Sequence, residues 1–85
     1  MKNEIFLDEF YYECDDVLDE KLPKYLESWK TAPFSELRGK MLKQMEKLVL
    51  GKKFTELTYI EKEKMRRATI HIANYCFFLY NKLGE

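Results

Sequence analysis

The sequence predicts an all-α fold, a compact bundle of about four helices around a long apolar helix near its C-terminal end. Apolar residues recur at three- and four-residue steps through most of the chain, which is the period of an α-helix. β-branched residues are few, and only three glycines and two prolines interrupt the pattern. A chain of 85 residues is long enough for one domain, so residues 1–85 are expected to fold as a single helical unit.

The first helix is expected over residues 3–21. Phe6, Phe10, Cys14 and Val17 are spaced by three or four residues and form its apolar stripe. Acidic residues are frequent in its first turns, where they suit the positive N-terminal end of a helix. This helix therefore combines an apolar face with a strongly acidic one.

A short second helix is expected over residues 23–30. Proline is favoured in the first turn of a helix, and it disfavours helical geometry in the residue before it. Pro23 is therefore expected to end the first helix and to begin the second. Trp29 lies on the apolar side of this segment, and a second proline, Pro33, follows at the next break.

The third helix is expected over residues 34–50. Apolar residues at helical spacing, among them Leu37 and Met41, form its expected buried stripe. Gly39 falls inside this helix at a cost of about 1 kcal/mol relative to alanine, and it is expected to mark a close contact between helices. Gly51 is placed to end the helix in the left-handed conformation.

The fourth helix is expected over residues 59–83. Thr58 and Glu61 have the spacing of a capping box, which fixes the start of the helix. Residues 70–80 contain only two strongly polar side chains, and a helix that is apolar almost all round is a buried one. Three shorter helices can barely cover it, and this favours burial against a neighbouring copy of the chain.

The sequence has no motif for catalysis, cofactor binding or metal binding. Cys14 and Cys76 form no CxxC pair, and the single histidine cannot complete a zinc site with them. Both are expected to be buried free thiols, with one disulfide between them as the alternative. His71 has no acidic residue one turn away, so we expect a packed or hydrogen-bonded core histidine. No enzymatic activity, no cofactor and no metal are expected.

Charges are distributed unevenly along a chain whose formal net charge is zero. Residues 1–20 carry eight acids and one base, whereas residues 38–67 carry ten bases and four acids. The charged residues expected to contact a protein partner are Asp8, Asp15, Asp16, Asp19, Lys52, Lys53, Lys62, Arg66 and Arg67. Tyr11 and Trp29 are expected to serve as aromatic anchors, because these residue types are enriched at interfaces.

Three explanations of this charge layout stay open. The acidic helix can lie across the basic region of its own chain, or both can be solvated surfaces without a role. The third explanation is a head-to-tail contact, in which the acidic end of one copy meets the basic face of the next. Such heterologous contacts form rings when the rotation closes, and complementary charge sets register and association rate more than affinity.

Nucleic-acid binding is a weaker explanation of the basic residues. Phosphate contacts need lysines and arginines clustered on one surface. The residues that could form such a cluster are Lys52, Lys53, Lys62, Lys64, Arg66 and Arg67. The zero net charge and the acidic first helix argue against this as the main role. Protein partners are therefore expected before nucleic acid.

The second half of the chain carries a packing pattern found in a known family. One helix ends in Leu48-Val49-Leu50-Gly51-Lys52-Lys53-Phe54, the turn Thr55-Glu56-Leu57-Thr58 follows, and the last helix carries Ala68, Ile72, Tyr75 and Tyr80. Over residues 41–83 this pattern resembles the small head–tail connector (adaptor) proteins of tailed bacteriophages. The resemblance implies a non-enzymatic structural protein that forms a ring on the portal and helps to join tail to head. It also implies copies of the same chain and a portal-like protein as partners.

Two other functions stay open beside this one. A small helical protein can bind and inhibit a host enzyme or defence complex, with exposed aromatic residues as anchors. A DNA-associated regulator that uses the face of Arg66 and Arg67 is the third possibility.

The expected location is the cytoplasm, or a virion assembled in the host cytoplasm. No apolar run approaches the about 20 residues that span a membrane. Acidic residues follow the first methionine too closely for a secretory signal peptide. No contact with a membrane is therefore expected.

Overall fold

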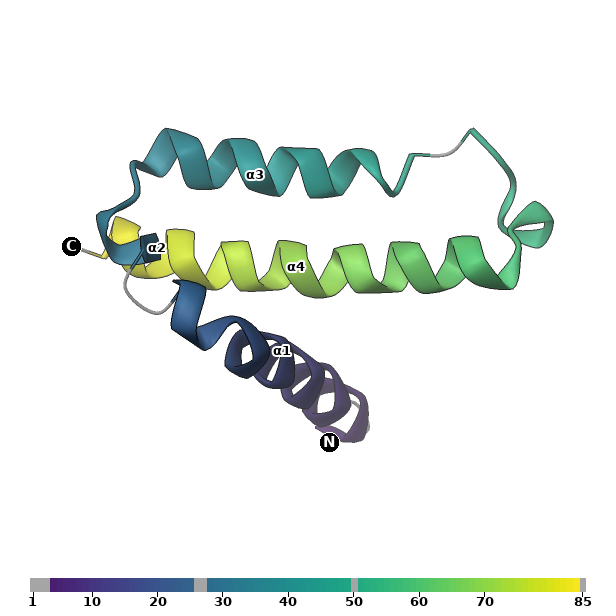
Figure 1. Ribbon diagram of the computed structural model, residues 1–85. Coiled ribbons are helices and arrows are strands. Elements are labelled where there is room, and N and C mark those ends of the chain that lie inside the picture. The colour runs from purple at the N-terminus through teal and green to yellow at the C-terminus, as the bar shows by residue number, and fades with distance from the viewer. Residues whose placement is uncertain (1–3, 26–27, 50, 85) are drawn as a thin grey trace.

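The computed structural model describes residues 4–25, 28–49 and 51–84, with the backbone alone for residue 5, residues 21–25 and residue 28. This part of the chain contains no strand and forms α1 (Glu4–Tyr25), α2 (Ser28–Thr31), α3 (Phe34–Glu46), the 3-10 helix η1 (Phe54–Glu56) and α4 (Tyr59–Leu83). The predicted all-α class with four α-helices is therefore confirmed. Helix α4 is the central element: α3 runs along one side of it, and α1 crosses it on another (Figure 1).

Helix α4 has the bounds that the sequence predicts, and local hydrogen bonds fix its start. Thr58 Oγ1 accepts a hydrogen bond from the Glu61 N–H at 3.1 Å, and the Glu61 carboxylate accepts one from the Thr58 N–H at 3.1 Å. This is the predicted capping box. Lys52 Nζ lies 3.0 Å from the same carboxylate. These contacts lower the pKa of Glu61 from its ordinary value, and the hydrogen bond from Lys52 has the largest effect.

Helix α1 is longer than predicted, because Pro23 does not end it. The predicted segment 3–21, whose first residue lies outside the described ones, is observed as Glu4–Tyr25. A proline inside a helix removes one backbone hydrogen bond, and the loss is confined to the last turn because only two more helical residues follow. Helix α2 is correspondingly short, Ser28–Thr31 in place of the predicted 23–30.

Helix α3 ends at Glu46, before the predicted end at residue 50, which lies outside the described residues. The backbone N–H groups of residues 47–49 bond to carbonyl groups three positions earlier, at distances between 3.0 and 3.2 Å. Such bonds tighten the last turn and end regular α-helical geometry. Gly51 has a φ of 65°, so the predicted left-handed conformation is present, but it lies in the connection beyond the helix.

Gly39 does not mark a close contact between helices, contrary to the sequence-based expectation. A Cβ atom added at this position meets no atom within 4 Å. The residue lies in the interior of α3, where glycine is a poor helix former. The structure therefore gives no packing reason for this glycine.

We expect Gly39→Ala to raise the free energy of unfolding by about 1 kcal/mol, because alanine favours the helix and has room here. A higher urea midpoint in circular dichroism checks this. Gly51→Ala is the matched control, and it should lower the midpoint, because alanine disfavours a φ of 65°. A lower midpoint for Gly39→Ala would contradict this expectation, because it would mean that another part of the protein packs closely against α3 at residue 39.

The core is small and centred on the region where α2, α3 and α4 meet. Its buried cluster consists of Leu37 from α3 with Phe78 and Leu79 from α4. The Trp29 ring of α2 stacks on Phe78, with 5.1 Å between the ring centroids and 11° between the planes. The partly buried hydrophobic residues packed against this cluster are Leu18, Trp29, Ala32, Met41 and Tyr75. The predicted interface anchor Trp29 is thus part of the core.

The chain exposes more surface than its size requires. Its radius of gyration is 14.4 Å, compared with about 12 Å for a compact domain of 85 residues. Its accessible surface is 6971 Å², compared with about 5,400 Å² for a typical monomeric protein of 10.3 kDa. The excess is therefore about 1,600 Å². One visible cause is α1, whose first half points away from the other helices (Figure 1).

Candidate functional site

Helix α1 is attached to α4 through its middle turns. Val17 is buried, and it lines a shallow depression together with Ile70 of α4. The buried amide of Asn74 donates a hydrogen bond to the backbone carbonyl of Cys14 at 3.3 Å. Desolvation, and then the neighbouring carboxylate of Glu13, raise the pKa of the Cys14 thiol. These contacts lie in residues 13–20 of α1, where the two helices cross.

The apolar stripe of α1 continues beyond this crossing without cover. Phe6 and Phe10 precede Cys14 by two turns and one turn on the same face, and they are 71% and 42% exposed. The periodicity groups them with Val17, but two helices that cross at an angle cover each other only near the crossing (Figure 1). The α1 patch, as we call these exposed apolar residues, consists of Phe6, Leu7, Phe10, Tyr11 and Tyr12.

Two ion pairs hold the acidic helix against the basic start of α4. Arg66 Nη2 lies 3.3 Å from the Glu13 carboxylate, and Arg67 Nη2 lies 3.2 Å from that of Glu20. All four side chains are about half exposed, so each pair contributes roughly 0–1 kcal/mol. The first of the three explanations of the charge layout, contact within one chain, therefore accounts for Arg66 and Arg67.

We expect the double change Arg66→Glu with Arg67→Glu to lower the free energy of unfolding by roughly 1–2 kcal/mol at low salt, because two attractions become repulsions. Urea unfolding at low and high salt checks this, and the loss should shrink at high salt through screening. Adding Glu13→Arg and Glu20→Arg restores opposite charges and should recover the stability. A double variant as stable as the wild type at low salt would mean that these pairs do not fasten α1.

The other predicted contact residues do not converge on one place. Lys52 is engaged at the capping box of α4, and Lys62 Nζ lies 4.7 Å above the ring of Phe54. Lys53 is exposed in the connection before η1. Tyr11 is exposed and meets the neighbouring Tyr12 edge to face, with 5.6 Å between centroids. Four of the predicted contact acids of α1 are exposed and form no ion pair within the described residues: Asp8, Asp15, Asp16 and Asp19.

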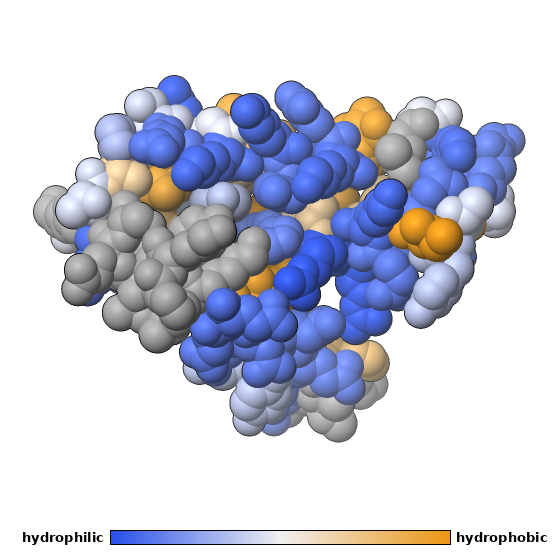
Figure 2. Space-filling model, in the orientation of Figure 1, coloured by the Kyte–Doolittle hydropathy of each residue, from blue (hydrophilic) through white to orange (hydrophobic). Residues whose placement is uncertain are grey.

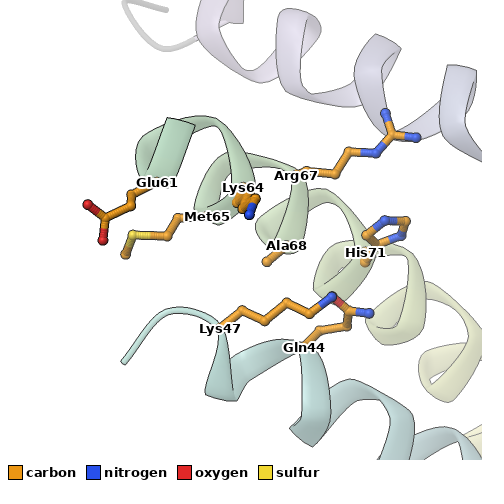
Figure 3. A pocket seen from close by; sticks show the side chains of 8 residues that line it. All are labelled: Gln44, Lys47, Glu61, Lys64, Met65, Arg67, Ala68 and His71. Atoms are coloured by element: carbon orange, nitrogen blue, oxygen red, sulfur yellow. The ribbon is translucent and has the colours of Figure 1, made fainter. Parts of the chain in front are cut away.

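A groove lies between the C-terminal end of α3 and the first half of α4 (Figure 3). Its volume is about 610 Å³, within the range of about 300–1,000 Å³ that is typical of binding pockets. The residues that line this α3–α4 groove are Gln44, Lys47, Glu61, Lys64, Met65, Arg67, Ala68 and His71. Figure 3 shows Lys47 and Gln44 of α3 on the side that faces α4, whereas Arg67 extends toward α1.

The α3–α4 groove has an apolar floor and a positive rim. Met65 and the buried Ala68 supply the apolar part. Lys47 and Lys64 make no ion pair within the residues that the structure describes, whereas the other two charged residues of the groove are each paired with a neighbour outside it. The amide oxygen of Gln44 is buried and accepts no hydrogen bond from the described part of the chain. The groove therefore suits an apolar ligand with negative charge and a hydrogen-bond donor.

The cysteines are free, as the sequence predicts, but they are not both buried. Cys14 is half-buried under α4, whereas Cys76 is exposed. Cys76 Sγ lies 3.7 Å from Met41 Sδ of α3. The expected burial of Cys76 is therefore wrong, even though its thiol contacts α3. His71 is half-buried and lines the groove, so it is not a fully packed core residue.

The visible surface is largely hydrophilic, with hydrophobic side chains showing between α3 and α4 (Figure 2). In residues 4–25, 28–49 and 51–84, no group of three or more His, Cys, Asp or Glu side chains could hold a metal ion. No helix of this part is long and apolar enough to cross a membrane.

Comparisons with protein-family models, with curated proteins and with solved structures found no match. The α1 patch and the α3–α4 groove are two candidate binding surfaces of the described residues.

Proposed function

We propose that this chain is a non-enzymatic assembly protein that binds copies of itself and a portal-like protein, as the head–tail adaptors that it resembles do. The observation that carries the proposal is the α1 patch, a set of large apolar side chains exposed on a projecting half-helix. Contiguous exposed apolar surface on a small protein marks a site of interaction. The resemblance over residues 41–83 implies the more specific part of the proposal, which is that the copies form a ring and that the ring binds the portal.

The surface excess supports an assembly role independently of the resemblance. A stable protein–protein interface buries about 1,600 Å² in total, or about 800 Å² on each partner. A chain in a ring uses two such faces, one toward each neighbour, and so covers about 1,600 Å² of its own surface. The chain exposes more surface than a typical monomer of its mass, which leaves room for two such faces.

Inhibition of a host protein is the second candidate, because Tyr11 and Tyr12 form an exposed aromatic pair of the kind that anchors interfaces. An inhibitor of this kind would bind one target with fixed stoichiometry and would form no ring. The DNA-associated regulator has less support, since Glu13 and Glu20 already engage Arg66 and Arg67. The latter two side chains would have to give up these ion pairs to contact phosphates.

Mixing the purified chain with portal rings encoded in the same genome tests the proposed function. We expect electron microscopy to show added ring density on the portal, and Phe6→Ser with Phe10→Ser to reduce it. Tyr80→Ser is the control, because Tyr80 is an exposed aromatic residue on α4 outside the α1 patch. A chain that leaves the portal bare at every concentration would contradict the proposal and favour the inhibitor.

A further inference from the structure

We propose that the α1 patch of one copy binds in the α3–α4 groove of the next copy, head to tail. This inference rests on the proposed function and names the two surfaces through which copies meet. The occupant of the groove is thus residues 4–12 of a second copy. Helix-in-groove binding of this kind is a common mode, in which an amphipathic helix lays its apolar face into an apolar groove.

The two surfaces cannot meet within one chain. The contacts at Cys14 and Val17 hold α1 on one side of α4, and the groove lies between α4 and α3 on another side (Figure 1). The first half of α1 leads away from that groove. When the patch of each copy binds the groove of the next, the contact is heterologous, and it repeats from copy to copy until a ring closes.

The charges of the two surfaces are complementary. Residues 4–12 contain three acids and no base. Lys47 and Lys64 stand on the rim of the groove without an ion pair in the described part of the chain. Asp8 and Glu9 likewise form no ion pair there. The ion pairs that hold α1 to its own α4 use Glu13 and Glu20, so Asp8 and Glu9 stay available to a neighbour.

The uncharged parts of the two surfaces also match. Phe6 and Phe10 are one turn apart on one face of α1 and can enter the groove together over Met65 and Ala68. Beside them, the hydroxyl group of Tyr11 can donate a hydrogen bond. The buried amide oxygen of Gln44 is an acceptor without a donor in the described part of the chain. A second copy therefore supplies apolar surface, negative charge and a donor in one short helix.

Mixing two variants tests the proposal. Lys47→Glu with Lys64→Glu makes a groove-deficient chain that keeps its α1 patch, and Phe6→Ser with Phe10→Ser makes a patch-deficient chain that keeps its groove. We expect the wild type to form complexes larger than a dimer at roughly 100 μM, since interfaces of standard size have micromolar or lower Kd values. Each variant alone should stay at the monomer mass of 10.3 kDa. The mixture should give a dimer with one chain of each kind, measured by sedimentation and native mass spectrometry.

Controls separate this inference from the general assembly role. Circular dichroism verifies that each variant keeps its helices, and Tyr80→Ser with Leu83→Ser, two exposed residues at the other end of α4, should assemble as the wild type does. A groove-deficient chain that still self-associates, or a mixture that stays monomeric, overturns the inference while leaving portal binding to its own test. A wild-type chain that is monomeric throughout also overturns it, because the occupant is then not a second copy.

Discussion

Phe78→Ala is expected to lower the free energy of unfolding by about 3–5 kcal/mol, the usual cost of removing a buried aromatic ring. Phe78 is 5% exposed and belongs to the buried cluster with Leu37. It also stacks on Trp29 and meets Tyr75 edge to face, with 6.0 Å between centroids. A small domain has a free energy of unfolding near the low end of about 5–15 kcal/mol. The variant should therefore be largely unfolded at moderate temperature.

The neighbouring residue Phe77 provides the matched control for this prediction. It is 49% exposed, so Phe77→Ala removes the same chemical group from a half-solvated position. Urea unfolding followed by circular dichroism should give less than half the loss seen for Phe78→Ala. Equal losses for the two variants would show that Phe77 is covered in solution as well as Phe78.

Val17→Asp is expected to detach α1 from α4 and to unfold α1 without unfolding the α3–α4 pair. Among the α1 side chains that the structure describes, Val17 is the buried hydrophobic one, and acids surround it on its own helix. A new carboxylate there would be both desolvated and repelled. An isolated helix of 22 residues with this composition is only marginally stable in water. The helical signal at 222 nm should fall by about a third, the share that α1 contributes.

Tyr12→Asp is the control for this second prediction, because it adds the same charge to an exposed position of the same helix. It should leave the helical signal and the unfolding midpoint nearly unchanged. If Val17→Asp also kept the full helical signal, α1 would not depend on its contact with α4. If it lost the whole signal, the α3–α4 pair would depend on α1.

The core of the described residues is small, so the proposed contact between copies would add to the stability of the fold. The hydrophobic side chains that the structure buries in its described part are Val17, Leu37, Ala68, Ile70, Phe78 and Leu79. Binding to the folded state adds stability according to concentration and affinity. The midpoint of thermal unfolding is therefore expected to rise with protein concentration, as it does for self-associating proteins.

The sequence predicts best those features that local interactions decide. The capping box of Thr58 and Glu61 and the unbroken apolar period give the bounds of α4 correctly. The left-handed conformation of Gly51 follows from the residue type, since glycine alone lacks a Cβ. Helix propensity does not predict the other two helix ends. Helix α3 ends early because its last turn tightens, and α1 continues past Pro23 because only two more helical residues follow.

The candidate site depends on how the helices cross, which periodicity does not encode. Phe6 and Val17 have the same place in the helical pattern, yet only Val17 lies at the crossing with α4. Lys47 and Lys64 are part of the basic stretch in the sequence, but they become neighbours only when α3 folds back along α4 (Figure 3). Trp29 is a residue type that often anchors interfaces, and only its stacking on Phe78 reveals its role in the core.

Amide hydrogen exchange at low and high protein concentration tests most directly whether a second copy covers the α1 patch. Between about 1 μM and about 200 μM, a range that brackets a micromolar Kd, the amides of residues 8–12 should become protected. Those of α3 and α4 that border the groove should become protected in parallel, while the last turn of α4 near Tyr80 should not change. Exchange at residues 8–12 that is equally fast at both concentrations, or protection at Tyr80 in their place, would contradict the head-to-tail contact.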